Sequence, residues 1–280
     1  MKKKNVNEYP FDKYIKILIQ RKITKKTFLK YSNEVFKLIE NIKKKKIKII
    51  KSKYFGDIIV PKANNGIKKN FYDLFAFHEL SLFAKYIKLK NKFNYALDIG
   101  ANLGLHTIIL SRLGYNVKSF EADPTTFKKL KINLERNLCQ NYKIYNFAVS
   151  DFNGSSKFYQ VTDNLTANTL ENSSKKVYGK FKVIKVNVKK ITKYLPKSNV
   201  LIKLDVEGAE YNILKTIKFS NNYKKKIFLE VNDNISARKI FNFVKSKNLN
   251  CFAEINLWKK VKYLSEMPSN WKHDSILIDK

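Results

Sequence analysis

Residues 95–104 have the sequence Tyr-Ala-Leu-Asp-Ile-Gly-Ala-Asn-Leu-Gly, and this stretch decides the fold. The apolar run at its start is typical of a buried strand, and it passes through a glycine-bounded turn into an apolar helical pattern. Gly100 allows the backbone to turn tightly, and Gly104 allows a ligand or a neighbouring strand to approach the helix start without a Cβ in the way. Asp98 places a carboxylate at this turn, which suits a cationic ammonium group rather than a pyrophosphate.

Strands and helices alternate from residue 94 onward, which predicts a doubly wound α/β sheet with helices on both faces. The apolar runs predict five strands and two later edge strands: Tyr95–Ile99, Val117–Glu121, Lys143–Val149, Val200–Val206, Lys226–Val231, Cys251–Asn256 and Ser275–Asp279. Helical spacing predicts helices over 104–113, 125–138, 207–219 and 235–247. The insertion over 152–190 alternates in polarity and is too long for a plain connection, so we expect a hairpin with a loop.

Residues 1–70 differ in composition from the rest, with Lys-rich helical stretches followed by two short apolar runs that resemble strands. One helical stretch carries an apolar stripe made of Tyr31, Val35, Leu38 and Ile42. The turn Asn64–Gly66 then precedes a helix that we expect to begin near Phe71 and to lead into the main domain. The sequence therefore predicts an N-terminal extension, 1–70, and one large domain, 71–280.

The second predicted strand of the domain ends in an acidic residue, Glu121, which lies 23 residues after Asp98. A carboxylate at this strand tip can accept both hydrogen bonds from a ribose diol. Dinucleotide-binding turns use Gly-x-Gly-x-x-Gly to face a pyrophosphate, whereas this turn lacks the middle glycine and carries an acid beside the first. The simpler alternative is that the glycines only make a turn and that the two acids cap helices.

Lys203 interrupts the otherwise apolar fourth strand. Central strands of a parallel sheet are buried on both faces and are nearly all apolar, so a lysine breaks the pattern. Side chains alternate along a strand, which places Lys203 and Asp205 on one face. A buried ammonium needs an anionic partner, and neighbouring strand tips offer Asp98 and Glu230. A structural ion pair and a position facing the substrate are equally open for this lysine.

Four segments together carry a family resemblance: Asp98–Gly104, Phe120–Pro124, Ala148–Asp151 and Lys203–Glu210. They resemble the FkbM family of class I methyltransferases over roughly residues 70–280, and the last segment is the most specific. The resemblance implies a Rossmann-like sheet of about seven strands with the last one antiparallel, and S-adenosylmethionine as the methyl donor. It usually implies O-methylation of a sugar or polyketide-type hydroxyl. The family's usual Glu-Pro after the second strand appears here as Glu-Ala-Asp-Pro.

The same resemblance implies which residues hold the donor. It assigns donor binding to Asp98, Gly100, Asn102, Gly104 and Glu121, and it places Ala148 near the adenine.

Acidic residues gather where the fourth strand meets the next helix. Asp205 ends that strand, and Glu207 and Glu210 are three residues apart, so a helix places both on one face. Carboxylates at a helix start are stabilised by the helix dipole, which is the simpler explanation for either glutamate. In a methyltransferase of this class, a carboxylate here can also take the proton of a hydroxyl or accept its hydrogen bond. The catalytic candidates are, in order, Asp205, Glu207 and Glu230, with Lys203 beside them.

Histidine, metal and disulfide chemistry have little support. The histidines are scattered, and His106 in the first turn of a helix is expected to be a packing residue. The acids named above and Asn232 carry oxygen ligands, but their spacing is not diagnostic, so we expect no metal. Cys139 and Cys251 match no metal-ligand or Cys-x-x-Cys spacing, which indicates buried reduced thiols.

The formal charge of +34 indicates anionic partners, but the kind of basic residue argues against nucleic acid. Only four of the 57 basic residues are Arg, the residue suited to bidentate contacts with phosphates and bases. The lysines are spread along the chain, which predicts a solvated basic surface with weak attraction to anionic glycans or membrane surfaces. No stretch approaches the roughly 18 apolar residues that a membrane span needs. We therefore expect a cytoplasmic protein without a transmembrane segment.

Two other functions stay open. Methyl transfer to RNA or another nucleic acid calls for an aromatic wall that stacks on a flipped base, and the segment Asp205–Gly208 offers none. A donor-binding scaffold without chemistry would not need Asp98, Glu121 and Asp205 together. The sequence thus predicts an S-adenosylmethionine-dependent O-methyltransferase for a hydroxylated acceptor, a sugar or glycan, whose identity it does not specify.

Overall fold

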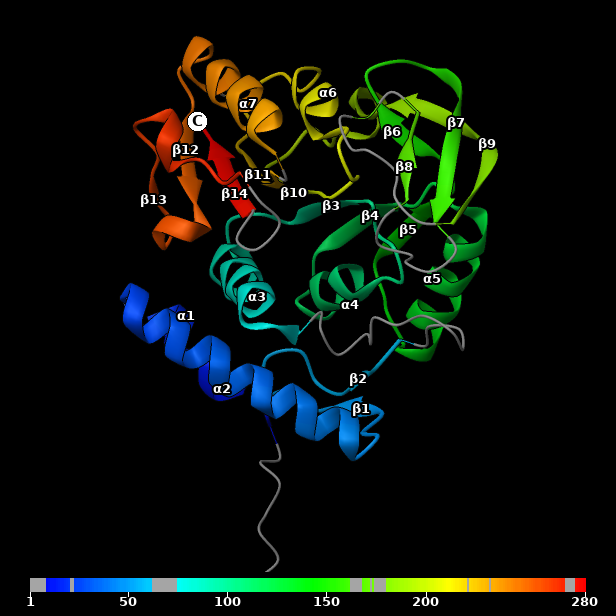
Figure 1. Ribbon diagram of the computed structural model, residues 1–280. Helices are drawn as coiled ribbons and strands as arrows, with labels where there is room; N and C mark the ends of the chain where they lie inside the picture. Colours follow the sequence, from blue (N-terminus) through cyan, green and yellow to red (C-terminus); the bar gives the residue numbers. More distant parts are fainter. Residues whose placement is uncertain are drawn as a thin grey trace, which may run out of the picture.

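Within the described residues, an eight-stranded mixed sheet forms the centre of the molecule (Figure 1). The structure is a computed structural model and describes residues 9–20, 23–61, 75–161, 168–171, 173, 180–220, 222–231, 233–269 and 275–280. In spatial order, the strands are β13 (Lys259–Lys260), β12 (Asn250–Ala253), β14 (Ser275–Asp279), β11 (Lys225–Glu230), β10 (Val200–Leu204), β3 (Tyr95–Ile99), β4 (Asn116–Phe120) and β5 (Tyr142–Tyr145). The strands from β11 to β5 are parallel, and β14 is antiparallel to β11. This order confirms the predicted doubly wound sheet, with the two-residue β13 as an addition.

The strand order reverses between β3 and β10. The chain runs outward from β3 to β4 and β5, and later returns to form β10 on the other side of β3. Ligands of open α/β sheets bind beyond the carboxyl ends of the strands at such a point. The register pairs Asp98 with Lys203 and Ile99 with Leu204, so the turn after β3 lies beside the segment after β10.

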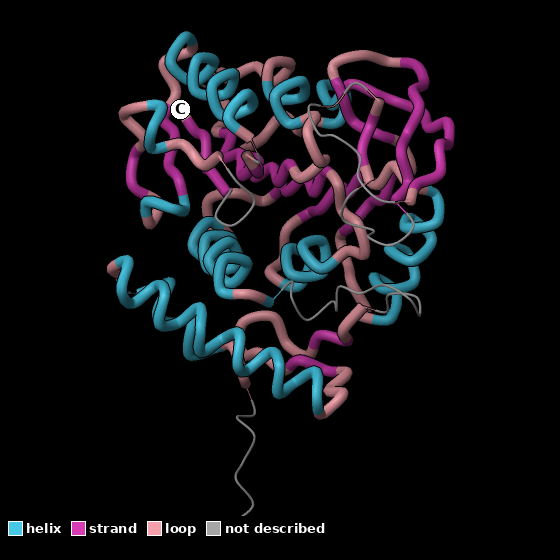
Figure 2. The backbone as a smooth tube through the Cα atoms, in the orientation of Figure 1, coloured by secondary structure: helices cyan, strands magenta, loops and turns pink. Residues whose placement is uncertain are grey.

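Helices cover both faces of this sheet (Figures 1 and 2). One face carries α3 (Phe77–Leu89), α4 (Leu105–Arg112) and α5 (Pro124–Arg136), and the other carries α6 (Glu210–Leu214) and α7 (Asn234–Ser246). Strand side chains alternate, so Ala96 and Leu201 join the apolar cluster of α3 and α4, while Leu97 and Ile202 join that of α7. Burial on both faces explains why these strands are nearly continuous apolar runs.

The N-terminal segment packs on the outer side of α3. It contains α1 (Asp12–Gln20), α2 (Lys25–Lys44) and the antiparallel pair β1 (Ile49–Ile50) and β2 (Ile58–Ile59). Val35 and Ile42 of the predicted stripe are buried in the same apolar cluster as Leu80 and Phe83 of α3, so this segment shares a core with the main sheet. The predicted turn Asn64–Gly66 and the predicted helix start at Phe71 lie outside the described residues.

A second sheet, four-stranded within the described residues, stands beside the β5 edge (Figure 2). Its order is β6 (Ala148–Ser150), β9 (Phe181–Lys190), β7 (Gly154–Val161) and β8 (Thr169–Leu170). The antiparallel pairing of β7 with β9 confirms the predicted hairpin. The prediction of one strand over Lys143–Val149 is wrong, because β5 ends at Tyr145 and β6 pairs with β9 instead. Asn146 lies between the two strands, and its side-chain Nδ2 donates a hydrogen bond to the Glu121 carbonyl at 2.9 Å.

The remaining described elements are short 3-10 helices: η3 (Ile191–Tyr194), η4 (Glu254–Asn256) and η5 (Leu264–Glu266).

Candidate functional site

Gly100 allows the tips of β3 and β10 to touch. Its φ is +83°, which favours glycine, and a Cβ built on it would lie 1.7 Å from the carbonyl oxygen of Asp205. The backbone N–H of Asp205 also donates to the Ile99 carbonyl at 3.0 Å. A glycine at this position therefore holds the predicted donor turn directly against the predicted catalytic segment.

Gly104 has a different neighbour from the one that the sequence indicated. Its φ is +96°, and a Cβ built on it would lie 2.5 Å from Cδ1 of Leu130 in α5. The nearby element is therefore a helix, not a strand. Gly104 lets α5 pack closely against the start of α4, so α5 supports one side of the predicted donor turn.

Asp98 is almost fully buried at the end of β3, with an exposed fraction of 1%. Its Oδ2 accepts a hydrogen bond from Thr107 Oγ1 at 2.6 Å, and Thr107 Oγ1 in turn lies 2.8 Å from Ser119 Oγ. Within the described part of the chain, Asp98 Oδ1 has no hydrogen-bond partner, and neither does the buried Oδ1 of Asn102. Buried acceptors without partners are rare, so these two atoms mark where a ligand with N–H or O–H groups fits.

Glu121, directly after β4, joins two loops through its carboxylate. Its Oε2 accepts from the backbone N–H of Asn102 at 2.8 Å, and its Oε1 accepts from that of Asp123 at 2.9 Å. Burial raises the pKa of Glu121 to about 7, although both backbone hydrogen bonds favour the charged form. Each oxygen has a second lone pair, so the predicted contacts with a ribose diol remain available. Ala148, at the start of β6, lies in an apolar cluster with Ala122 next to Glu121.

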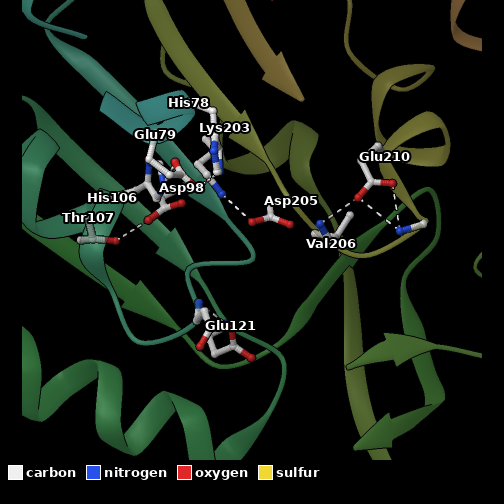
Figure 3. Close-up of polar contacts among 12 residues, drawn as sticks. His78, Glu79, Asp98, His106, Thr107, Glu121, Lys203, Asp205, Val206 and Glu210 are labelled. Carbon is white, nitrogen blue, oxygen red and sulfur yellow. Dashed lines mark hydrogen bonds and ion pairs between the residues drawn. The ribbon is translucent and has the colours of Figure 1, made fainter. Parts of the chain in front are cut away.

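Lys203 lies among several acids and pairs with Asp205, two residues further along the chain (Figure 3). Its Nζ donates to Asp205 Oδ2 at 2.8 Å, and its side chain is only 5% exposed. Burial alone would lower the pKa of Lys203, but Asp205, and then Asp98 and Glu230, raise it well above its usual value. The ammonium therefore stays charged between the donor turn and the catalytic candidates. Asp205 is 28% exposed, and Figure 3 shows its second carboxylate oxygen pointing away from Lys203.

The prediction of a helix over 207–219 is wrong at both ends, because α6 spans only Glu210–Leu214. Glu207 has a φ of +58° and Gly208 a φ of +107°, values that a helix does not accept. The two glutamates therefore do not share a helix face. Glu210 is buried and accepts backbone hydrogen bonds from Val206 and Gly208, each at 2.9 Å, so it stabilises the loop. Burial raises the pKa of Glu210.

A further buried acid, Glu79, which was not among the site residues predicted from the sequence, lies near Asp98 and Lys203 (Figure 3). Its Oε2 is 3.1 Å from Nε2 of His106, whose Nδ1 is 3.1 Å from the hydroxyl of Tyr86. Burial alone would raise the pKa of Glu79, but His106 lowers it to about 2. The available signal was a glutamate within the apolar pattern of α3. His106 packs edge-on against Phe83 and Tyr86 as a packing residue would, but its ring also contacts the carboxylate of Glu79.

Other predicted features are placed as follows. Among the described residues, no group of three or more His, Cys, Asp or Glu side chains is arranged to hold a metal ion, and Asn232 lies outside them. Cys251 is buried, Cys139 is half-buried, and both are free thiols. In the described ranges, no helix combines the length and apolar character needed to cross a bilayer.

Comparisons with known proteins identify the family. The family model described as "Methyltransferase FkbM domain" matches residues 98–258, which is more than half of the chain. That range contains the donor turn, Glu121, Ala148 and the segment from Lys203 to Glu210. No curated protein sequence matches the chain.

Solved structures with a similar fold share little sequence identity with the chain. A precorrin-6y C5,15-methyltransferase from Geobacter metallireducens is 13% identical, with 78% of this chain and 90% of that chain covered and a TM-score of 0.38. A putative methyltransferase from Streptococcus mutans in complex with SAH is 14% identical, with coverage of 71% and 97% and a TM-score of 0.38. A tRNA (uracil-54, C5)-methyltransferase from Pyrococcus abyssi in complex with S-adenosyl-L-homocysteine is 14% identical, with coverage of 83% and 44% and a TM-score of 0.40. The match of the family model, together with the doubly wound sheet, shows that this chain belongs to the FkbM family of methyltransferases.

Proposed function

We propose that this methyltransferase uses S-adenosylmethionine to methylate a hydroxyl group of a sugar or glycan. The observation that carries the proposal is the buried Oδ1 of Asp98, which has no hydrogen-bond partner among the described residues and lies where the strand order reverses. The donor supplies a methyl group on a positively charged sulfonium and also carries an ammonium group. A buried carboxylate at this point favours such a cation over a phosphate-bearing cofactor.

The donor turn offers the further groups that such a ligand needs. Asn102 presents a second buried acceptor, and the carboxylate of Glu121 keeps free lone pairs beside it. Ala148 and Ala122 form an apolar wall next to Glu121, which suits an adenine ring. We therefore assign donor binding to the turn from Asp98 to Gly104, to Glu121 and to Ala148.

The acceptor hydroxyl is expected at Asp205. Lys203 fixes one oxygen of Asp205 at 2.8 Å, and the other oxygen remains for a hydrogen bond from the acceptor. Methyl transfer is an in-line displacement, so holding the hydroxyl in line with the donor supplies much of the rate. The hydroxyl proton passes to a carboxylate as the new C–O bond forms and the bond between the methyl carbon and the donor sulfur breaks, with the sulfur leaving as a neutral thioether. Asp205 is the first candidate for this proton, followed by Glu207 and Glu230.

A cavity of about 210 Å³ between the second sheet and α6 supports a sugar-like acceptor. Its lining includes hydroxyl, amide and carboxylate groups together with an aromatic ring, contributed by Ser150, Ser156, Asn212, Asp151 and Phe152. Polyhydroxylated ligands pair with such groups through several hydrogen bonds. Leu170 also lines the cavity, and the hydroxyl of its neighbour Thr169 donates to the Glu207 carbonyl at 2.7 Å, which joins this side of the cavity to the loop after Asp205. The free cysteines suit a reducing compartment, so we place the reaction in the cytoplasm.

Two substitutions test the donor and acceptor assignments separately. Asp98→Asn keeps an oxygen for Thr107 but removes the charge, so we expect S-adenosylmethionine to bind at least about thirtyfold more weakly by calorimetry. Asp57→Asn, an exposed change of the same kind, is the matched control. Asp205→Asn should lower turnover more than donor affinity, measured with labelled donor and extracted cell glycans. Wild-type affinity in Asp98→Asn, or label found in RNA instead of glycans, would contradict the proposal.

A further inference from the structure

The long helix α2 has two different faces. Its inner face buries Phe28, Val35, Ile39 and Ile42 against the core. Its outer face exposes lysines at spacings of four and seven residues: Lys26, Lys30, Lys37 and Lys44. Residues three, four and seven apart lie along one side of a helix, so these lysines form a continuous basic stripe.

Two large apolar side chains border this stripe. Leu29 is 60% exposed and Phe36 is 62% exposed. They are seven residues apart, which is about two helical turns, so they project from the same side of α2. Single exposed apolar residues are common, but a pair in register beside a lysine stripe is typical of a helix that lies in a membrane interface.

The two acids of α2 do little to offset its positive charge. Glu34 accepts from the Tyr14 hydroxyl at 3.0 Å and lies 3.4 Å from Lys13 Nζ, on the side facing α1. Glu40 pairs with Lys43 at 2.8 Å. The chain directly after the helix adds more exposed basic residues, Lys45, Lys46 and Lys48. The outer surface of α2 therefore has a strong net positive charge.

The methyl-transfer site does not use this surface. α2 lies at the periphery of the molecule, outside α3, and the site lies at the carboxyl edge of the central sheet (Figure 1). The inner face of α2 explains why the helix packs on the core. Packing does not explain why Leu29 and Phe36 point outward.

We propose that the outer face of α2, formed by Lys26, Leu29, Lys30, Phe36, Lys37 and Lys44, docks on a bilayer rich in anionic phospholipids. The lysines complement the negative headgroups, and the two apolar side chains enter the headgroup boundary while the helix lies parallel to the surface. A nucleic acid fits this face less well. No basic residue of α2 is an arginine, and a phosphate backbone gives Leu29 and Phe36 nothing apolar to contact.

Vesicle sedimentation of the full chain tests the proposal. The vesicles contain phosphatidylcholine mixed with phosphatidylglycerol, or phosphatidylcholine alone. Wild type should bind only the anionic vesicles, and added salt should weaken binding. Lys30→Glu combined with Lys37→Glu should bind at least about tenfold more weakly, because each basic residue near an anionic surface strengthens binding roughly fivefold. Leu29→Ser combined with Phe36→Ser should also weaken binding while leaving the charge unchanged.

The matched control is Lys239→Glu combined with Lys245→Glu. It removes the same net charge from exposed positions of α7, which covers the opposite face of the sheet (Figure 1). This variant should bind anionic vesicles like wild type, and all variants should keep the wild-type melting temperature. Equal losses in the α2 and α7 charge variants would show diffuse attraction and overturn the proposal. Binding of labelled RNA that depends on α2, without binding to vesicles, would overturn it in favour of a nucleic-acid surface.

Discussion

The contact between Gly100 and Asp205 makes a sharp prediction for Gly100→Ala. A methyl group at this position would lie 1.7 Å from the Asp205 carbonyl oxygen, whereas real Cβ atoms essentially never come within 3.0 Å of another heavy atom. Both contact partners belong to backbone, so no side chain can rotate away. The tips of β3 and β10 must therefore separate by more than 1 Å.

Comparison with other glycines separates the destabilisation by Gly100→Ala into a backbone contribution and a contact contribution. Gly114 has a φ of +85°, close to that of Gly100, but nothing lies within 4 Å of the position that an added methyl group would take there. Gly114→Ala should therefore destabilise the protein only by the cost of the left-handed backbone, about 1–2 kcal/mol. Gly100→Ala adds overpacking of about 1–3 kcal/mol and the loss of the Asp205 to Ile99 hydrogen bond, about 1 kcal/mol. The total destabilisation by Gly100→Ala is about 4 kcal/mol.

Urea denaturation measures these differences as free energies of unfolding. Gly104→Ala should fall between the other two variants, because its neighbour is the flexible end of Leu130. Calorimetry with S-adenosylmethionine should show that Gly114→Ala retains donor binding and Gly100→Ala loses it. Equal destabilisation by Gly100→Ala and Gly114→Ala would refute the reasoning that the Asp205 carbonyl is the reason for a glycine at position 100.

Three further predictions concern the buried charges, each followed by urea denaturation across pH. Lys203→Met leaves Asp98 and Asp205 without the nearby ammonium, so it should destabilise the protein by about 3–5 kcal/mol at pH 8. Burial raises the pKa of Glu121 from 4.5 to about 7, so folding takes up a proton between these two pH values. The free energy of unfolding should therefore fall by roughly 3 kcal/mol as the pH rises from 4.5 to 7, and Glu121→Gln should remove this decline. The pKa of Glu79 is lowered from 4.5 to about 2, so its contribution to the free energy of unfolding is present above pH 4.5 and is lost as the pH falls towards 2. Glu79→Gln should lower stability at pH 7 and reduce the loss of stability between pH 4.5 and 2. An unchanged pH profile in either glutamine variant would contradict the corresponding assignment.

The turn after β3 could be predicted because its sequence signals are local. An apolar strand, a glycine at a positive φ and an acid one residue before the strand end all fall within ten residues, and the structure places them as expected. The doubly wound sheet with helices on both faces also followed from the alternation of strands and helices. Lys203 stood out for a local reason, since a charge in a central strand is rare, and its ammonium forms an ion pair with Asp205.

The loop after β10 could not be predicted, because distant residues determine its shape. The sequence Asp-Val-Glu-Gly-Ala-Glu resembles a helix start, yet Glu207 adopts a left-handed conformation. The hydroxyl of Thr169, 38 residues earlier, holds the Glu207 carbonyl, and Glu210 turns back to bind the N–H of Gly208. The prediction of one strand over Lys143–Val149 was wrong for a similar reason. The chain divides there into β5 and β6 because β6 pairs with β9, which starts more than 30 residues later.

The balance of buried charge is the feature that only the three-dimensional structure supplies. In the sequence, Asp98, Asp205 and Glu230 are all available as partners for the ammonium of Lys203, and Glu79 gives no sign of lying near them. In the structure, Glu79 lies 3.1 Å from His106, and the Lys203 ammonium hydrogen-bonds to Asp205, whereas Asp98 accepts a hydrogen bond from the hydroxyl of Thr107 and interacts with Lys203 through charge alone. Oδ1 of Asp98 is therefore left buried without a hydrogen-bond partner in the described chain. Burying such an oxygen without a partner lowers the free energy of unfolding. A cationic ligand that binds there would regain that free energy as affinity.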